Sequence, residues 1–122
     1  MSAFDEVDSI PPQQVWDGIV ARPVHGERLT LAVVELEPNA VVAEHSHDHE
    51  QLGIVVRGRI RFRVGDEQRD LKPGGTWRIA SQTSHEATAG PDDGATVIDV
   101  FAPSRDDWQT LEQQEPQPAR WP

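Results

Sequence analysis

The segment from Glu44 to Gln51 holds the side chains best suited to chemistry, since it contains three of the chain's five histidines. His45, His47 and His49 alternate along the sequence, so in an extended strand their side chains would project from one face. Imidazole nitrogens are common ligands of divalent metals, and Gln51 continues the alternation with a neutral carbonyl oxygen. The spacing therefore predicts a metal site on one strand face, and a solvated, acidic, histidine-rich loop is the alternative.

The elements that must position this segment are short β-strands. Residues 29–37 and 95–102 are apolar on both faces, residues 59–64 alternate strictly between arginine and apolar side chains, and residues 41–49 form the expected strand that carries the histidines. Turn signals recur at intervals of about ten residues and no long helical period is present, which is typical of an antiparallel sandwich or barrel. The two-sided strands also indicate a homodimer, because both of their faces need to be buried.

Length and composition fit a single domain. The chain has 122 residues, and we expect an acidic, proline-bearing arm at residues 1–14, the folded domain at 15–112 and a loose Pro/Gln-rich tail at 113–122. The absence of cysteine excludes disulfides, thiolate metal sites and a cysteine nucleophile.

Charge and hydropathy narrow the class of partner. The formal net charge is -10, from 21 acidic against 11 basic residues, which argues against a nucleic-acid partner because such binding needs a basic face. No apolar run approaches about 18 residues, so we expect no membrane span and no leader, and we interpret the chain as a soluble, cytoplasmic protein. A small molecule is the expected partner.

The spacing around the histidines resembles the first sequence motif of the cupins. Asn39, His45, His47, Gln51 and Gly58 occupy the defined positions of the pattern G-x5-H-x-H-x3,4-E-x6-G. Two positions depart from the pattern: asparagine replaces the first glycine, and glutamine replaces the glutamate. Asparagine is the next best residue where a turn needs a positive φ.

The second cupin motif is recognisable, but three of its positions depart from the usual residues. Gly74 and His85 stand at the right separation, while Ala80, Gln82 and Ala89 occupy positions where proline, glycine and asparagine are usual. This motif is a weak signal without the first one.

The cupin resemblance covers roughly residues 18–108 and implies an all-β, single-domain fold: an antiparallel double-sheet β-barrel, or jelly roll, with a metal held inside the barrel mouth. By position, the resemblance implies that the metal ligands are His45, His47, Gln51 and His85, with His49 as a further candidate. The implied cofactor is one divalent ion, for which Zn, Ni, Mn and Fe are the candidates.

Within the cupins, the chain resembles the small pectin-degradation enzymes, which open 4,5-unsaturated uronates toward their linear ketone forms. Those enzymes contain His-x-His-x-x-Glu-Gln, as residues 45–51 do, and their last strand runs into Asp-x-Phe-x-Pro-x-Arg-x-Asp-aromatic, as residues 99–108 do. This resemblance implies that Asp99 and Arg105 are the catalytic pair and that Phe101 lines the pocket.

A glutamine ligand has a physical consequence. The amide of Gln51 does not cancel charge as a carboxylate would, so a site of three histidines and one glutamine keeps the full +2 of its metal. Such a site polarises a bound oxygen strongly, and it departs from the 2-His-1-carboxylate pattern of iron oxygenases. The residues therefore favour Lewis-acid and proton-transfer chemistry over oxygen activation; a site that has lost its metal is the alternative.

Two further side chains suit that chemistry. Asp99 lies between Val97 and Phe101 on its strand face, and a carboxyl among apolar side chains should have a raised pKa suited to moving a proton. Arg105 could hold a substrate carboxylate with two parallel hydrogen bonds. The alternatives are a structural pair between Asp99 and an arginine, and a surface salt bridge between Arg105 and a neighbouring aspartate.

The leading functional hypothesis is a metal-dependent isomerase or lyase acting on unsaturated uronates. The competing hypotheses are a polyketide cyclase, since metal-dependent cyclases of the cupin fold also use glutamine among their ligands, a cupin dioxygenase, and a non-catalytic sugar- or metal-binding cupin. The pocket lining separates the first two, because polar walls suit a sugar and broad apolar walls suit a polyaromatic molecule.

Overall fold

The computed structural model of the protein describes residues 2–122, so Met1, the first residue of the expected arm, lies outside the described residues. The elements in chain order are η1 (Val7–Ser9), β1 (Gln13–Trp16), β2 (Ile19–His25), β3 (Thr30–Leu36), β4 (Val41–His45), β5 (Glu50–Gly58), β6 (Ile60–Val64), β7 (Glu67–Leu71), β8 (Thr76–Ile79), β9 (His85–Ala89), β10 (Ala95–Ala102) and η2 (Asp106–Thr110). Across residues 2–122, no helix has both the length and the apolar character needed to cross a membrane.

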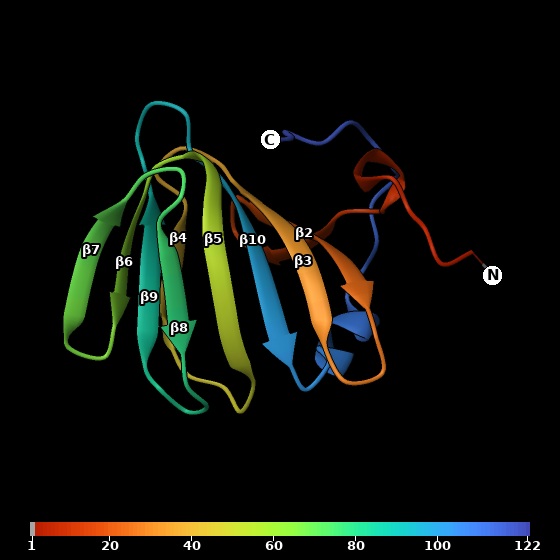
Figure 1. The fold of residues 1–122 in the computed structure, drawn as a ribbon. Coiled ribbons are helices and arrows are strands. Elements are labelled where there is room, and N and C mark those ends of the chain that lie inside the picture. The colour runs from red at the N-terminus through yellow and green to blue at the C-terminus, as the bar shows by residue number, and fades with distance from the viewer. Residues whose placement is uncertain (1) are drawn as a thin grey trace.

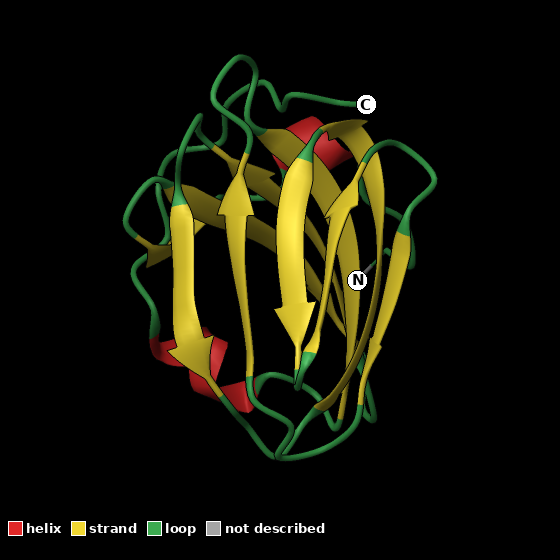
Figure 2. Cartoon of the chain, turned by 90° about the vertical axis from the view of Figure 1, so that its left-hand side faces the viewer, coloured by secondary structure: helices red, strands yellow, loops and turns green. Residues whose placement is uncertain are grey.

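The strands form two antiparallel sheets that face each other (Figures 1 and 2). One sheet has six strands in the order β1-β2-β3-β10-β5-β8, and the other has four in the order β4-β9-β6-β7. The expected all-β double-sheet architecture is confirmed. The core lies between the sheets because each strand alternates inward and outward side chains.

Strand register brings distant residues into rows on the inner face of the six-stranded sheet. Asp99 of β10 lies opposite Gly53 of β5, which lies opposite Trp77 of β8. One row further along, Val97 lies opposite Val34 of β3. The inner face thus changes from polar to apolar along β10 within two residues.

The histidine segment does not form the single strand 41–49 expected from its alternation. β4 ends at His45, the chain bends through residues 46–49, and β5 begins at Glu50. The reason is topological: β4 belongs to the four-stranded sheet and β5 to the six-stranded sheet, so the chain must cross from one sheet to the other. His47 and His49 therefore take their positions from a crossing segment and not from a shared strand face.

Both terminal segments pack against the six-stranded sheet. β1 begins two residues before the expected domain boundary at residue 15, and Gln13 forms a bridge to Gln113 in the expected tail. Arg22, only 2% exposed, donates hydrogen bonds to backbone carbonyl oxygens of Val7, Ile10, Gln117 and Pro118. A buried guanidinium needs several acceptors, and the two terminal segments supply them here.

Candidate metal centre

Three of the histidines selected from the sequence converge between the two sheets. His45 at the end of β4 lies directly opposite His85 at the start of β9, and His47 reaches them from the crossing segment. One ring nitrogen from each of the three lies within 4.8 Å of the others. The ring centroids of His45 and His85 are 4.3 Å apart, and those of His47 and His85 are 4.9 Å apart.

Backbone carbonyl groups fix the orientation of all three rings. The Nδ1 atoms lie 2.8 Å from Ala43 O for His45, 2.9 Å from His49 O for His47 and 2.9 Å from Thr83 O for His85. A carbonyl oxygen only accepts, so in each ring Nδ1 carries the hydrogen and Nε2 is left with a lone pair. A carbonyl on Nδ1 is a common way to orient a histidine that ligates a metal through Nε2.

The chemistry of this donor set fits a divalent cation. His85 Nε2 is buried without a hydrogen-bond partner among the described residues. Burial is the largest cause that lowers the pKa of His85 to about 4, and it also lowers the pKa of His47, so both rings favour the neutral form that a metal requires. A buried lone pair without a partner is costly, and a bound cation would remove that cost.

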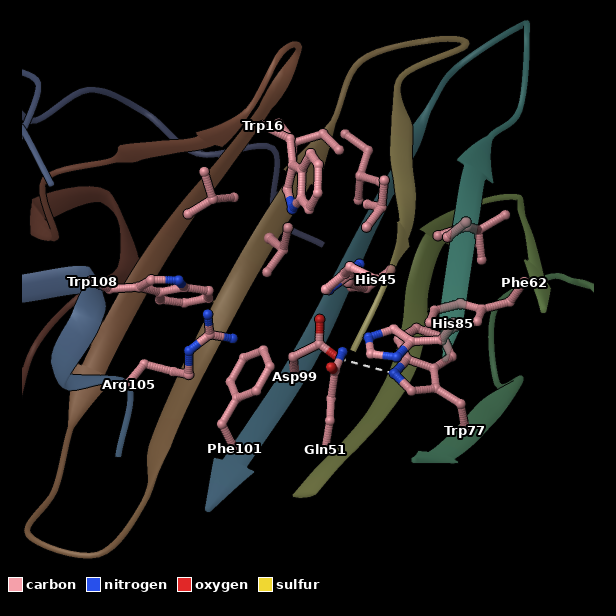
Figure 3. Close-up of a pocket in the computed structure, with 18 of the residues that line it drawn as sticks. Trp16, His45, Gln51, Phe62, Trp77, His85, Asp99, Phe101, Arg105 and Trp108 are labelled. Atoms are coloured by element: carbon pink, nitrogen blue, oxygen red, sulfur yellow. Dashed lines mark hydrogen bonds between the residues drawn. The ribbon is translucent and has the colours of Figure 1, made fainter. Parts of the chain in front are cut away.

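Gln51, the fourth candidate ligand, connects the histidines to Asp99. Its Nε2 donates a 2.9 Å hydrogen bond to Asp99 Oδ1, and the two side chains lie together in Figure 3. Its Oε1 lies 3.1 Å from His47 Nε2. A carboxylate only accepts, so the amide nitrogen must face Asp99 and the carbonyl oxygen must face the histidines. Two lone pairs, on Gln51 Oε1 and His47 Nε2, then face each other, and a shared cation is the group that would satisfy both.

Asp99 is buried, and its Oδ1 accepts a second hydrogen bond of 2.9 Å from Trp77 Nε1. Burial raises the pKa of Asp99 to about 6, although the hydrogen bonds from Gln51 and Trp77 and the charge of Arg105 act in the opposite direction. A raised pKa is expected for Asp99 from the sequence because its strand neighbours are apolar, and burial is indeed the main cause.

Trp77 is a site residue that the sequence analysis missed. Its indole reaches Asp99 by crossing over Gly53 in the intervening strand, where an added Cβ would lie 2.2 Å from the ring. A glycine opposite a tryptophan on the inner face is a signal in the sequence, but it can be interpreted only when the register between β5, β8 and β10 is known.

Arg105 makes the salt bridge with a neighbouring aspartate that the sequence offered as one alternative. Its guanidinium donates to Asp107, with Nε to Oδ1 at 3.1 Å and Nη2 to Oδ2 at 2.9 Å, and these bonds lower the pKa of Asp107. The same guanidinium lies 4.7 Å from the ring centroid of Phe101 and 4.4 Å from that of Trp108, and it lines the cavity. Two aromatic faces and one carboxylate thus hold its orientation.

His49 is not one of the three converging histidines. Its Nε2 lies 4.0 Å from Asp107 Oδ1, and its buried Nδ1 has no hydrogen-bond partner among the described residues. Its ring meets that of His47 edge to face at 5.6 Å. The structure therefore places His49 beside the group, in contact with the Arg105–Asp107 pair.

A cavity of about 310 Å³ opens beside these groups, between the two sheets (Figure 3). Its polar lining residues are His45, Gln51, His85, Asp99, Arg105 and Asp107. Its other lining residues are apolar: Val15, Trp16, Ile19, Val34, Leu36, Val42, Ile60, Phe62, Trp77, Ala87, Val97, Phe101, Trp108 and Leu111. The wall of the cavity is therefore mainly apolar.

Comparisons with known proteins agree with this fold. KdgF from Halomonas sp. has a solved structure that is 32% identical, with a TM-score of 0.80, over 88% of this chain and 98% of that one. Two further structures show the same fold at lower identity. An RmlC-like cupin from Shewanella frigidimarina NCIMB 400 is 21% identical with a TM-score of 0.80, covering 88% of this chain and 96% of that one. An oxalate decarboxylase variant from Bacillus subtilis is 22% identical with a TM-score of 0.70, covering 81% of this chain and 29% of that one.

A comparison with curated protein sequences gives no significant match. The family model described as Cupin domain matches residues 32–101, a range that includes all four candidate metal ligands. On this match and the similarity to KdgF, the chain belongs to the cupin domain family.

Proposed function

We propose that this protein is a divalent-metal-dependent cupin enzyme that carries out non-redox proton-transfer chemistry on a small oxygenated substrate bearing a carboxylate. The reaction class is tautomerisation, ring opening or ring closure. Within this class, ketonisation of 4,5-unsaturated uronates is the leading activity. Its support is the resemblance of residues 45–51 and 99–108 to the pectin-degradation cupins and the 32% identity to KdgF over nearly all of that chain.

In this proposal His45, His47, Gln51 and His85 would hold the metal, which would supply Lewis-acid polarisation of a substrate hydroxyl or carbonyl oxygen. Arg105 orients the substrate carboxylate with the part of its guanidinium that Asp107 leaves open. Phe101 contributes to the apolar wall beside it. Asp99 takes a proton from one substrate atom and returns it to another, through Oδ2, which makes no hydrogen bond among the described residues.

One observation carries the proposal: the Gln51 amide spans the distance between His47 Nε2 and Asp99 Oδ1. A purely storage or sensor site needs ligands only. Here the candidate ligand is joined by a hydrogen bond to a buried carboxyl that lines the same cavity, so the group that would carry the proton lies beside the residues that would hold the metal.

The test combines metal content with turnover. Protein purified without chelator should contain close to one divalent ion per chain, and loss of unsaturated uronate, followed by ultraviolet absorbance, should require that ion. Dialysis against chelator should abolish turnover, and re-addition of a divalent metal should restore it. Metal-independent turnover, or a metal-loaded protein that consumes oxygen with iron and leaves the uronate unchanged, would contradict the proposal.

A second activity, cyclisation of a polyketide, is supported by the cavity wall. Fourteen of the twenty lining residues are apolar, which is the type of wall expected for an aromatic substrate and not for a sugar. The same metal, Asp99 and Arg105 would serve this reaction, so the test above is repeated with a poly-β-ketone substrate when the uronate is not consumed.

We also propose that two copies form a homodimer through the outer face of the six-stranded sheet. Val24, Leu31, Val100 and Leu52 follow one another across β2, β3, β10 and β5 in register, with Ile98 and Ile54 in the next row. Val24, Leu31, Leu52 and Ile54 are between 36% and 45% exposed. A continuous aliphatic face is complementary to itself about a two-fold axis, which favours a second copy as its occupant. The expected cytoplasmic location stays a prediction.

A further inference from the structure

The charged and amide side chains of the cavity gather toward one end of it. In Figure 3 Gln51, Asp99 and Arg105 lie together, and Trp16 lies at the opposite end of the labelled set. Along β10 the inner face changes from Asp99 to Val97, which lies opposite Val34, and Leu36 lies one row beyond. The cavity thus has a polar head end and an apolar subsite formed by Val15, Trp16, Val34, Leu36, Val42 and Val97.

We propose that this apolar subsite takes the body of the substrate, so that the preferred ligand is a compact carboxylate with one metal-binding oxygen and an apolar, single-ring-sized body. The inference rests on the proposed function for the position of the metal-binding oxygen and of the carboxylate. It goes further because it also places the remaining part of the substrate, which contacts neither the histidines nor Arg105.

The first argument is that the polar groups of the wall are already engaged with each other. Asp99 Oδ1 accepts from Gln51 and Trp77, and both carboxylate oxygens of Asp107 accept from Arg105. What remains is Asp99 Oδ2, the open side of the guanidinium, the metal and the indole N–H groups of Trp16 and Trp108, which make no hydrogen bond among the described residues. These can serve one carboxylate and a small number of further oxygens. Each additional hydroxyl would lose its water without gaining a partner, at a cost of about tenfold or more in affinity.

The second argument is the composition of the subsite itself. Its six side chains carry one polar atom in total, the indole nitrogen of Trp16, whose ring faces His45 at 5.2 Å between centroids. An apolar ring placed there would displace water from an aliphatic and aromatic surface, which is the main favourable contribution available in such a cavity.

The third argument is size. A volume of about 310 Å³ is at the lower end of the range of about 300–1,000 Å³ for small-molecule sites. This volume suits one ring with a carboxylate and leaves little room for a large fused ring system. A sugar acid such as the uronate of the proposed function also fits by size, but its hydroxyls find few partners in the subsite. The class expected to bind most tightly is a hydroxy- or keto-carboxylate with an aliphatic or aromatic ring.

The experiment compares three probes that share a carboxylate: glycolate, mandelate and galacturonate. Glycolate carries only the hydroxy-carboxylate head, mandelate adds a phenyl body, and galacturonate adds a hydroxylated ring. Titration calorimetry with the zinc-loaded full chain should show mandelate binding about ten- to a hundredfold more tightly than glycolate, from burial of one ring. Galacturonate should bind no more tightly than glycolate.

A matched pair of variants tests the location. Val42→Phe narrows the subsite from β4, whereas Val41→Phe adds the same ring at the neighbouring position, which is 53% exposed and does not line the cavity. The advantage of mandelate over glycolate should largely disappear in Val42→Phe and should persist in Val41→Phe. If Val42→Phe does not fold, the order of the three probes with the parent protein decides alone.

The outcomes separate this inference from the proposed function. Equal affinities for mandelate and glycolate, or tighter binding of galacturonate than of mandelate, overturn the apolar subsite while leaving metal-dependent turnover of uronates intact. If the protein takes up no metal, the proposed function fails. Phenylacetate, which lacks the hydroxyl, then tests the subsite on the metal-free chain: binding that weakens in Val42→Phe but not in Val41→Phe supports it, and no binding overturns it.

Discussion

Gln51 Nε2 lies 2.9 Å from Asp99 Oδ1, across the neighbouring strands β5 and β10. This hydrogen bond determines which end of the amide faces the histidines, since a carboxylate offers no donor. Without Asp99 the Gln51 amide would be free to turn its NH2 group toward the histidine Nε2 atoms, where a cation could not be bound. Asp99 therefore has two roles in the proposal: it lines the cavity as a candidate proton carrier, and it orients a candidate metal ligand.

These two roles can be separated by Asp99→Asn. The carbonyl oxygen of the substituted side chain can still accept from Gln51 and Trp77, so the orientation of Gln51 and the metal content should be retained. The proton-carrying group is lost, and turnover should fall by a factor on the order of 10² to 10⁴. Metal analysis and a rate measurement on the same preparation check this, and full activity in a metal-loaded variant would remove Asp99 from the chemistry.

Replacing Gln51 by glutamate tests the value of a neutral ligand. Gln51→Glu removes the donor to Asp99 and places two carboxyls side by side, so the metal-free variant should be less stable than the parent. A bound cation would offset that repulsion, and metal addition should raise the melting temperature more in the variant than in the parent. Turnover should nevertheless fall, because the carboxylate cancels one unit of the metal's charge. An unchanged turnover rate would show that the neutral ligand has no importance.

The Trp77–Gly53 pair should affect the site through Asp99. Trp77→Phe keeps a ring in place to stack on Phe62, 4.6 Å away between centroids, but removes the indole N–H that Asp99 accepts. Loss of a buried hydrogen bond to this carboxyl should lower the free energy of unfolding by about 1–3 kcal/mol and weaken metal binding. Thermal unfolding with and without metal checks both effects.

Gly53→Ala should also lower the free energy of unfolding and weaken metal binding, because the new methyl group would displace the indole that lies across position 53. Overpacking of this kind costs about 1–3 kcal/mol. Arg78→Ala is the matched control for both variants, since Arg78 is exposed on the opposite side of β8 from Trp77. This substitution should change neither the free energy of unfolding nor the affinity for metal. Wild-type metal affinity in Trp77→Phe and in Gly53→Ala would mean that Asp99 does not depend on its second donor.

The sequence alone was sufficient for the fold class and for the three histidines that converge, but not for Trp77 or for the reason the histidines meet. His45, His47 and His85 do lie together, yet the alternation of His45, His47 and His49 in one strand was the wrong explanation. Alternation describes residues within a strand and contains no information on where the chain changes sheet. Cupin motif spacing gave the better prediction, since it describes the two sheets together.

Contacts that depend on the register between strands distant in sequence could not be predicted from the sequence. Trp77 meets Asp99 only because β8 and β10 flank β5, and no local pattern specifies that order. The packing of the two terminal segments could not be predicted either. Residues near both ends look unstructured from composition, whereas Arg22 in β2 binds four of their backbone carbonyl groups, and an arginine in a strand does not reveal its acceptors.

Removal of single histidines should distinguish ligands from neighbours. His85→Ala removes a nitrogen that points into the group of three, so metal stoichiometry and the metal-induced rise in melting temperature should both be lost. His49→Ala should retain both, because its Nε2 lies 4.0 Å from Asp107 and outside that group. Metal analysis after dialysis separates the two outcomes, and loss of metal from His49→Ala would make His49 a ligand after all.

The outer face of the six-stranded sheet gives a prediction on assembly that is independent of the metal. Leu52→Lys places a charge in the aliphatic row, directly beside Val100, where a second copy would bury it without a partner. The dimer should dissociate at least about tenfold more readily, as measured by sedimentation or light scattering over a range of concentrations. Val41→Lys is the control, because Val41 is 53% exposed on β4 in the other sheet and should leave the assembly unchanged. A parent protein that sediments as a monomer, or dissociation caused equally by both variants, would place the contact elsewhere or exclude it.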